Sequence, residues 1–344
     1  MVKGDNMSGD AGISPVFHGG DLGAASRTFP QARRPWVDLS TGINPRAYPV
    51  PVLAPAVWTR LPEPDALTDL EQVAATAYGA AAGTHVVAAP GSQALIQRVP
   101  WLLSPRRVAV LGPTYGGHAP AWTAAGHSVE TVASLADCAG AGVVVVTNPN
   151  NPDGRCLSAE ALIAAGAGLG PDGLLVIDEA FADVMPEISF AERLADHPRI
   201  LVLRSFGKFF GLAGVRLGFA LTADGDLAGR LRDHLGAWPV SGAAIAIGQT
   251  ALADQAWQAA TRAELAASAR RLDALLGGAG LTVIGGTSLF RFVATHAAEP
   301  WHQRLGACGI LVRRFAEQPQ YLRFGLPGLE AEWARVAAAL DTCA

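Results

Sequence analysis

Short apolar runs alternate with helical or loop segments from about residue 85 to residue 222. The run from Gly142 to Thr147 reads G-V-V-V-V-T, and a strand that is apolar on both faces is typical of a buried parallel sheet. Strands separated by helical segments predict an α/β fold with a mainly parallel, doubly wound sheet. Ligands of such sheets bind at the carboxyl ends of the strands.

Residues that often bind ligands follow the ends of these strands: Gly91, Tyr115, Asn151, Asp178 and Ser205. A carboxylate at the end of an apolar strand, as at Asp178, is costly unless it is paired, and helix capping is its alternative role. Tyr115 either stacks on a planar ligand or packs on its own loop. Because the strand ends share one edge of the sheet, we expect these residues to form one site.

The stretch from Ser205 to Gly218 places a single lysine, Lys208, among aromatic side chains: S-F-G-K-F-F-G-L-A-G-V-R-L-G. Desolvation by these rings favours the neutral, nucleophilic amine. Ser205 and Arg216 offer hydrogen-bond donors to a phosphate. A solvated lysine on an amphipathic turn is the alternative interpretation.

A second candidate anion site lies where a predicted strand passes through a glycine turn into a predicted helix. The strand from His85 to Ala89 is followed by P-G-S-Q, with a helix start near Ser92. Free backbone N–H groups point into such a turn and favour an anion there. Gly91, Ser92 and Gln93 are therefore candidate phosphate ligands, and an ordinary strand-to-helix turn is the alternative.

The remaining sequence predicts a smaller α+β domain. We expect an N-terminal segment over residues 1–44 that packs with this small domain, a large ligand-binding domain over 45–235, and the small domain over 236–344. Arg323 lies in the apolar strand Y-L-R-F-G-L. Its guanidinium requires an anionic partner, which is either a protein carboxylate or a substrate carboxylate.

Composition and charge argue against several classes of protein. The net charge of −4, with no run of five like charges, argues against a nucleic-acid binder. The sequence contains no run of 18 uninterrupted apolar residues, so we predict no membrane span. The first residues lack the apolar region of a signal peptide. Four scattered cysteines without C-x-x-C spacing predict a reduced, cytoplasmic protein without a metal site.

Taken together, these segments resemble the class I/II aminotransferase family of pyridoxal 5'-phosphate (PLP) enzymes, which have fold type I. The ordered signature is N-P-N-N-P-D-G around Asn151, D-E-A-F from Asp178 and S-F-G-K ending at Lys208. The resemblance extends from about Asp38 to the end of the chain. It implies an α/β fold with a large and a small domain, and a homodimer with the active site at the subunit interface.

The same resemblance implies residue roles around PLP. Lys208 would bind the cofactor covalently, Asp178 would pair with its ring nitrogen, Asn151 would bond its phenolic oxygen, and Tyr115 would stack on its ring. Lys208, Asp178 and Tyr115 are thus the predicted catalytic residues. The predicted ligands of the cofactor phosphate are Gly91, Ser92, Gln93, Ser205 and Arg216.

Within the family, H-G-G-D at residues 18–21, D-L-S-T-G-I-N-P, R-L-P-E-P-D-A-L and D-E-A-F resemble the members that act on phosphorylated threonine in cobalamin biosynthesis. This implies PLP-dependent decarboxylation of L-threonine O-3-phosphate to (R)-1-amino-2-propanol O-2-phosphate. The alternatives are an aminotransferase, such as one acting on histidinol phosphate, and a non-catalytic PLP-binding sensor.

The predicted substrate is therefore a small phosphorylated amino acid. Its ligands would be Arg323 for the α-carboxylate, with Asn44 and Asn151 assisting. The candidates for the substrate phosphate are His18, Gly19 and Arg155; a simple turn at His18–Gly19 and a solvated loop arginine are the alternatives.

Two positions depart from the family pattern. Phe181 stands where many members have a tyrosine that bonds the phenolic oxygen. Leu61 stands where many members have a tyrosine that reaches the partner's cofactor phosphate.

Overall fold

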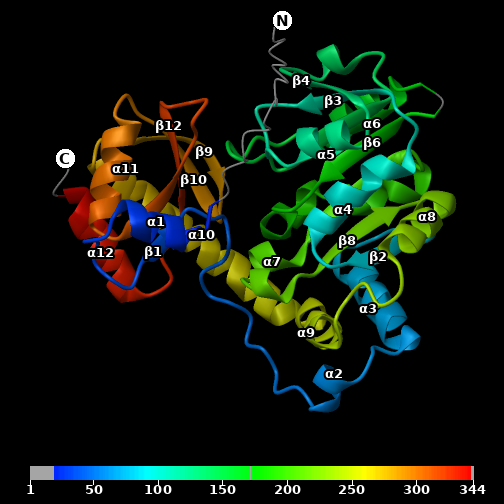
Figure 1. The fold of residues 1–344 in the computed structure, drawn as a ribbon, viewed down its shortest axis with the longest axis horizontal. Helices are drawn as coiled ribbons and strands as arrows, with labels where there is room; N and C mark the ends of the chain where they lie inside the picture. Colours follow the sequence, from blue (N-terminus) through cyan, green and yellow to red (C-terminus); the bar gives the residue numbers. More distant parts are fainter. Residues whose placement is uncertain (1–18, 171, 342–344) are drawn as a thin grey trace, which may run out of the picture.

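The computed structural model describes residues 19–170 and 172–341. Figure 1 shows two lobes, with the long helix α10 (Gln255–Gly278) running from one towards the other. His18, a predicted ligand of the substrate phosphate, lies outside the described residues.

The larger lobe is built on a seven-stranded sheet of order β2-β8-β7-β6-β5-β3-β4. Strand β8 is antiparallel to both its neighbours, and all other neighbouring pairs are parallel. This architecture confirms the predicted fold class. The bounds are β2 His85–Ala89, β3 Arg107–Leu111, β4 Ser128–Val132, β5 Val143–Thr147, β6 Leu174–Asp178, β7 Ile200–Ser205 and β8 Gly218–Thr222.

Both faces of the large sheet are covered by helices, as the uniformly apolar strands require. In β5, Val143 and Val145 belong to one core cluster and Val144 and Val146 to the other, because successive side chains point to opposite faces. One face carries α4 (Ser92–Arg98), α5 (His118–Ala124) and α8 (Gly225–Leu235). The other core cluster includes residues of α3 (Pro64–Ala77), α6 (Ala159–Ala167) and α9 (Gly242–Ala253).

The smaller lobe contains a five-stranded sheet of order β1-β11-β12-β10-β9. Strand β1 (Val37–Leu39) comes from the N-terminal segment and pairs in parallel with β11. The others are antiparallel: β9 Thr282–Thr287, β10 Phe290–Ala294, β11 Ile310–Arg314 and β12 Tyr321–Gly325. The remaining helices are α1 (Leu22–Thr28), α2 (Ala56–Thr59), α7 (Phe206–Phe209), α11 (Ala298–Ala307) and α12 (Glu330–Asp341).

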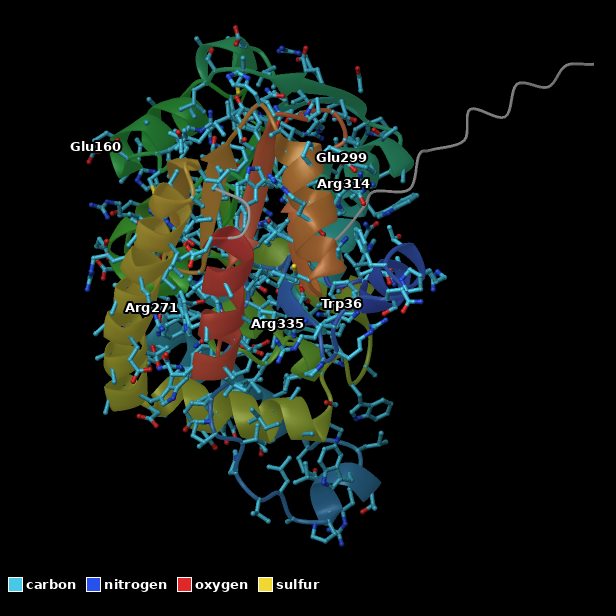
Figure 2. All side chains as sticks on the ribbon, turned by 90° about the vertical axis from the view of Figure 1, so that its left-hand side faces the viewer. Trp36, Glu160, Arg271, Glu299, Arg314 and Arg335 are labelled. Carbon is cyan, nitrogen blue, oxygen red and sulfur yellow. The ribbon has the colours of Figure 1, made fainter. Side chains whose placement is uncertain are left out.

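Arg335 on α12 fastens the N-terminal segment to the small lobe (Figure 2). Its guanidinium donates to the carbonyls of Arg33 at 2.7 Å, Pro35 at 2.6 Å and Cys308 at 2.7 Å. Val37 then enters β1 by donating its N–H to the Gly309 carbonyl. The segment that leads into the predicted substrate side of the site is thereby held against α12 and β11.

A buried ion network lies next to the end of β6. Arg204 donates to Glu179 at 2.8 Å and to Asp183 at 2.7 Å, and all three side chains are at most 5% exposed. Glu179 also accepts hydrogen bonds from the Phe190 N–H and the Ser189 hydroxyl. The network ties β7 to the loop after β6, so it fixes the chain beside both Asp178 and Ser205.

Two elements differ from what the local sequence predicts. The apolar run from Arg216 to Leu221 predicts a strand, but β8 begins at Gly218, because Arg216 adopts a left-handed backbone with φ 56° that a strand does not accommodate. The alanine-rich region from Asp226 to about Leu276 predicts helix interrupted at Trp238–Gly242, and the structure has a further break at Asp254. The side chain of Asp254 caps α10 by accepting the Trp257 N–H, so α9 and α10 are separate helices.

Candidate active site

The predicted ligand-binding residues meet at one edge of the large sheet. Gly91, Tyr115, Asn151, Asp178 and Ser205 lie at or beyond the carboxyl ends of β2, β3, β5, β6 and β7. Because β8 runs antiparallel to β7, its start lies at this same edge, and Arg216 precedes that start. The topology therefore brings the residues together from six strands.

Lys208 lies on the one-turn helix α7, and its side-chain ammonium group is unusually acidic. Burial, and after it the positive charge of Arg323, lower the pKa of Lys208 from its usual 10.5 to about 8, while the charge of Asp178 opposes the change. The backbone of α7 is held by Asn44, whose N–H donates to the Lys208 carbonyl and whose side-chain amide donates to the Phe209 carbonyl, both at 2.9 Å. About one-tenth of the Lys208 side chains thus carry a neutral amine at pH 7, far more than for a solvated lysine.

Asp178 is buried and both its carboxylate oxygens have partners. His118 Nε2 lies 2.9 Å from Asp178 Oδ2, and the Ala180 N–H donates to Oδ1 at 3.1 Å. His118 begins α5 and is itself only 1% exposed. Sequence reasoning missed this histidine; its position three residues after Tyr115 was the only available signal.

Tyr115 has a fixed position beside this pair. Its hydroxyl donates to Gln93 Oε1 at 2.9 Å, and its ring packs edge-on against His118 with centroids 5.9 Å apart. Burial raises the pKa of Tyr115, and the charge of Asp178 raises it further. The hydroxyl therefore remains protonated at neutral pH.

The glycine turn before α4 is in close contact with Arg216. Gly91 has a positive φ of 88°, and a Cβ atom built there would lie 2.9 Å from Arg216 Nη2. A Cβ on Gly218 would lie 2.3 Å from the Ser92 backbone nitrogen. No side chain caps the start of α4. The turn is therefore a tight backbone surface with a guanidinium beside it, which suits a phosphate.

Arg323 reaches the site from β12 of the small lobe. Its Nη1 donates to Asn151 Oδ1 at 2.5 Å, and its Nη2 donates to the Ser40 carbonyl at 2.9 Å. Its Nε has no hydrogen-bond partner among the described residues. Burial, and after it the positive charge of Arg313, lower the pKa of Arg323 to about 9. A buried guanidinium with an unused donor suits an anionic ligand.

Arg313 was not predicted as a site residue. It lies on β11, where its Cα faces that of Arg323 in the antiparallel ladder. Burial lowers the pKa of Arg313, and Tyr115 acts on it in the opposite direction. Two arginines thus lie side by side at the site, which favours a ligand with more than one negative charge.

The other predicted substrate residues have backbone roles in the structure. Asn44 accepts the Arg46 N–H through Oδ1 while donating to Phe209. A Cβ on Gly19 would lie 2.2 Å from the Ser40 carbonyl oxygen, so Gly19 lies against the segment that also contacts Arg323. The Arg155 N–H donates to Asp153 within the loop. Their contacts with a substrate remain predictions.

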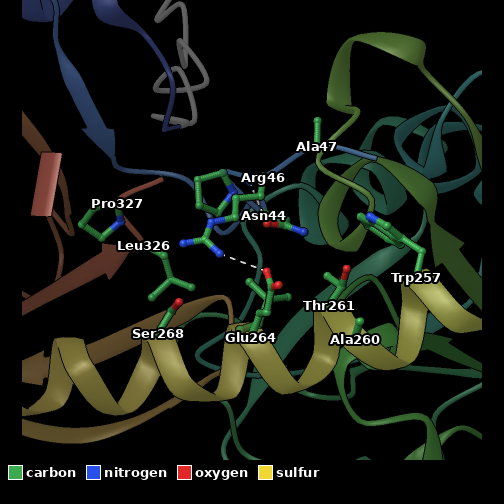
Figure 3. Close-up of a pocket in the computed structure, with 12 residues that line it drawn as sticks. Asn44, Arg46, Ala47, Trp257, Ala260, Thr261, Glu264, Ser268, Leu326 and Pro327 are labelled. Carbon is green, nitrogen blue, oxygen red and sulfur yellow. Dashed lines mark hydrogen bonds and ion pairs between the residues drawn. The ribbon is translucent and has the colours of Figure 1, made fainter. Parts of the chain in front are cut away.

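Figure 3 shows a cavity of about 120 Å³ between residues 44–47 and α10, where Arg46 pairs with Glu264 at 3.0 Å. Of the predicted site residues only Asn44 lines it, so this cavity adjoins the site at Asn44. Within residues 19–170 and 172–341, no cluster of three His, Cys, Asp or Glu side chains is placed to hold a metal ion. In the same ranges, no helix has the length and apolarity to cross a membrane.

The profile of the aminotransferase class I and II family matches residues 42–340, and the chain belongs to this family. Its sequence is 43% identical over 327 residues to the threonine-phosphate decarboxylase of Pseudomonas aeruginosa, covering 94% of this chain and 96% of that protein. It is 42% identical over 333 residues to the threonine-phosphate decarboxylase of Sinorhizobium sp, covering 95% and 98%.

The fold is also similar to that of histidinol-phosphate aminotransferase from Sinorhizobium meliloti, crystallised with PLP. The TM-score is 0.77 at 23% identity, covering 98% of this chain and 100% of that one. At this identity the likeness establishes the shared fold and leaves the reaction open.

The donor set of the site fits PLP. A partly neutral lysine, an anchored carboxylate and an aromatic ring are the groups its aldehyde, ring nitrogen and ring face require. The Gly91 turn and Arg216 form a cradle that a Cβ atom would fill. That these residues hold the cofactor remains a prediction.

Proposed function

We propose that the chain is a PLP-dependent lyase that converts L-threonine O-3-phosphate into (R)-1-amino-2-propanol O-2-phosphate and CO2 in cobalamin biosynthesis. The observation that carries this proposal is the 42–43% identity with two threonine-phosphate decarboxylases over nearly the whole chain. The pair of Arg313 and Arg323 supports it, because a phosphorylated amino acid presents a carboxylate and a phosphate.

In this proposal the chain's own residues hold PLP in one orientation. PLP, when bound, supplies the electron sink that accepts the bonding pair released at the substrate Cα. Asp178, held by His118 and the Ala180 N–H, keeps a negative charge at the cofactor's ring nitrogen. The Tyr115 ring lies against the cofactor, and Arg216 with the Gly91 turn binds its phosphate.

The two arginines orient the substrate. Arg323 binds the α-carboxylate through its unused Nε donor, and Arg313 beside it binds the substrate phosphate. The position in which Arg323 holds the carboxylate would decide which bond at Cα breaks once PLP supplies its electron sink. Lys208 Nζ then delivers a proton to Cα, and a pKa of about 8 suits this general acid–base role.

The similar structure that was crystallised with PLP is an aminotransferase, so transamination is the competing function. Incubating the holoenzyme with L-threonine O-3-phosphate is expected to release one CO2 per molecule consumed. A second incubation with histidinol phosphate and 2-oxoglutarate is expected to give no glutamate. Glutamate formation without CO2 release in the first reaction would refute the decarboxylase proposal.

We also propose a homodimer in the cytoplasm. Trp58 and Leu61 are 68% and 63% exposed on the segment around α2, and such apolar side chains are suited to burial against a second subunit. Sedimentation is expected to give twice the monomer mass, and Trp58→Glu is expected to weaken the dimer. A monomeric wild type at micromolar concentration would exclude it.

A further inference from the structure

One arginine of α10 contacts both the helix that carries Lys208 and the segment that follows β6. The guanidinium carbon of Arg262 lies 5.3 Å from the ring centroid of Phe209, which directly follows Lys208 in α7. Its Nε donates to the Asp183 carbonyl at 2.7 Å, and its Nη2 donates to Gln258 Oε1 at 3.2 Å. A planar guanidinium can stack on a ring and donate in its own plane at once.

The helix α7 depends on contacts of this kind for its position. It is a single turn of four residues, and so short a helix is not stable by itself. Asn44 holds its carbonyls, as described above. The remaining support comes from α10, where Trp257 lies parallel to Phe210 with centroids 5.6 Å apart and where Arg262 faces Phe209.

The Asp183 carbonyl gives Arg262 a fixed anchor. The Asp183 side chain is buried and accepts a hydrogen bond from Arg204 at 2.7 Å. Arg204 directly precedes Ser205 and also pairs with Glu179, which directly follows Asp178. The guanidinium on α10 is therefore fastened to the same network that fixes the chain beside Asp178.

The other half of α10 is fastened to the small lobe (Figure 1). Asp273 accepts two hydrogen bonds from Arg291 of β10, at 2.6 and 2.9 Å. In the β10–β12 ladder, Arg291 faces Phe324, the neighbour of Arg323. One helix thus supports both α7 in the large lobe and the strand that carries Arg323 in the small lobe.

We propose that Arg262 is a positioning residue for Lys208. By stacking on Phe209 and bonding the Asp183 carbonyl, it keeps α7 at one place between α10 and the segment after β6. Neither of its hydrogen-bond partners is a predicted cofactor or substrate residue, so its effect passes through α7. The inference rests on the proposed role of Lys208 and not on the identity of the substrate.

The first test needs no turnover. The sequence contains only two lysines, Lys3 and Lys208, so acetic anhydride labelling followed by peptide mass spectrometry reports on the Lys208 amine in the apoprotein. We expect a wild-type labelling midpoint near pH 8. Arg262→Met is expected to move it at least about half a pH unit higher, because a displaced amine regains contact with water. An unmoved midpoint would overturn the inference.

Arg271→Met is the matched control on the same helix. Arg271 also pairs with a carboxylate and stacks on a ring, but these belong to Glu330 at 2.6 Å and Trp333 at 4.4 Å, so we expect the wild-type midpoint. Phe209→Leu keeps the charge of Arg262 and removes its ring partner, and it is also expected to raise the midpoint. The double variant is expected to show no more than the larger single shift. Additive shifts, or a shift in Arg271→Met, would overturn the inference.

The second test uses the holoenzyme with L-threonine O-3-phosphate. Arg262→Met is expected to lower kcat for CO2 release about tenfold, while KM changes less than about twofold. Arg262→Lys keeps the charge and an N–H donor, and it is expected to recover part of the loss. An equal fall of kcat in Arg271→Met would overturn the inference.

The two tests separate the inference from the proposed function. A wild type that releases no CO2 would refute the decarboxylase, while labelling of the apoprotein would still decide the role of Arg262. If Arg262→Met does not fold, Phe209→Leu decides in its place, because it leaves the hydrogen bond to Asp183 intact. An unmoved midpoint in Phe209→Leu would then overturn the inference.

Discussion

Replacing Lys208 by methionine is expected to stabilise the apoprotein at neutral pH, although it removes the residue predicted to hold PLP. Methionine has similar length and no charge to desolvate. The pKa of Lys208 falls from 10.5 to about 8 on folding, mainly through burial. That difference corresponds to about 3 kcal/mol of unfavourable free energy whenever the buried amine is charged.

The sign of the pH dependence follows from proton binding. Between pH 8 and 10.5 the unfolded chain keeps the proton on Lys208 and the folded chain does not, so the free energy of unfolding rises with pH across this window. Below pH 8 the penalty is complete. Lys208→Met is therefore expected to gain up to about 3 kcal/mol at pH 7 and to lose most of that advantage by pH 10.

Urea unfolding of apoprotein at pH 7 and pH 10 measures this effect. The difference between variant and wild type isolates Lys208 from other titrating groups. Lys208→Arg, which keeps a charge, is the control and is expected to give no stabilisation at either pH. The reasoning fails if Lys208→Met is no more stable than wild type at pH 7, or if its advantage is equal at both pH values.

Three further predictions concern other parts of the site. Asp178→Asn removes the negative charge that His118 holds in place, and CO2 release is expected to slow at least about 100-fold; an active variant would remove Asp178 from the mechanism. Gly218→Ala places a Cβ 2.3 Å from the Ser92 nitrogen. The affinity for PLP, measured by absorbance titration, is therefore expected to fall at least about tenfold. An unchanged affinity would mean that this turn does not bind the phosphate of PLP. Arg204→Leu leaves the buried carboxylate of Glu179 without its ion-pair partner. Denaturant unfolding is expected to show that the free energy of unfolding falls by about 3–5 kcal/mol. A fall below about 1 kcal/mol would mean that the network rearranges to compensate for the lost ion pair.

Local sequence patterns were sufficient to predict much of the fold and the central residues of the candidate site. The apolar run in β5 predicts a strand buried on both faces because side-chain direction alternates along a strand. The edge that gathers Gly91, Tyr115 and Asp178 follows from parallel strand order. The order of Asn151, Asp178 and Lys208 was sufficient to predict the family, which the family profile confirms.

Only the tertiary structure placed residues whose partners are distant in sequence. His118 reaches Asp178 across 60 positions, and Phe290 of the small lobe packs on Phe181 of the large lobe. The register of β11 against β12 sets Arg313 opposite Arg323. Sequence periodicity fixes which face of a strand a residue occupies, but not which strand lies beside it, so these contacts were decided by how the two lobes pack.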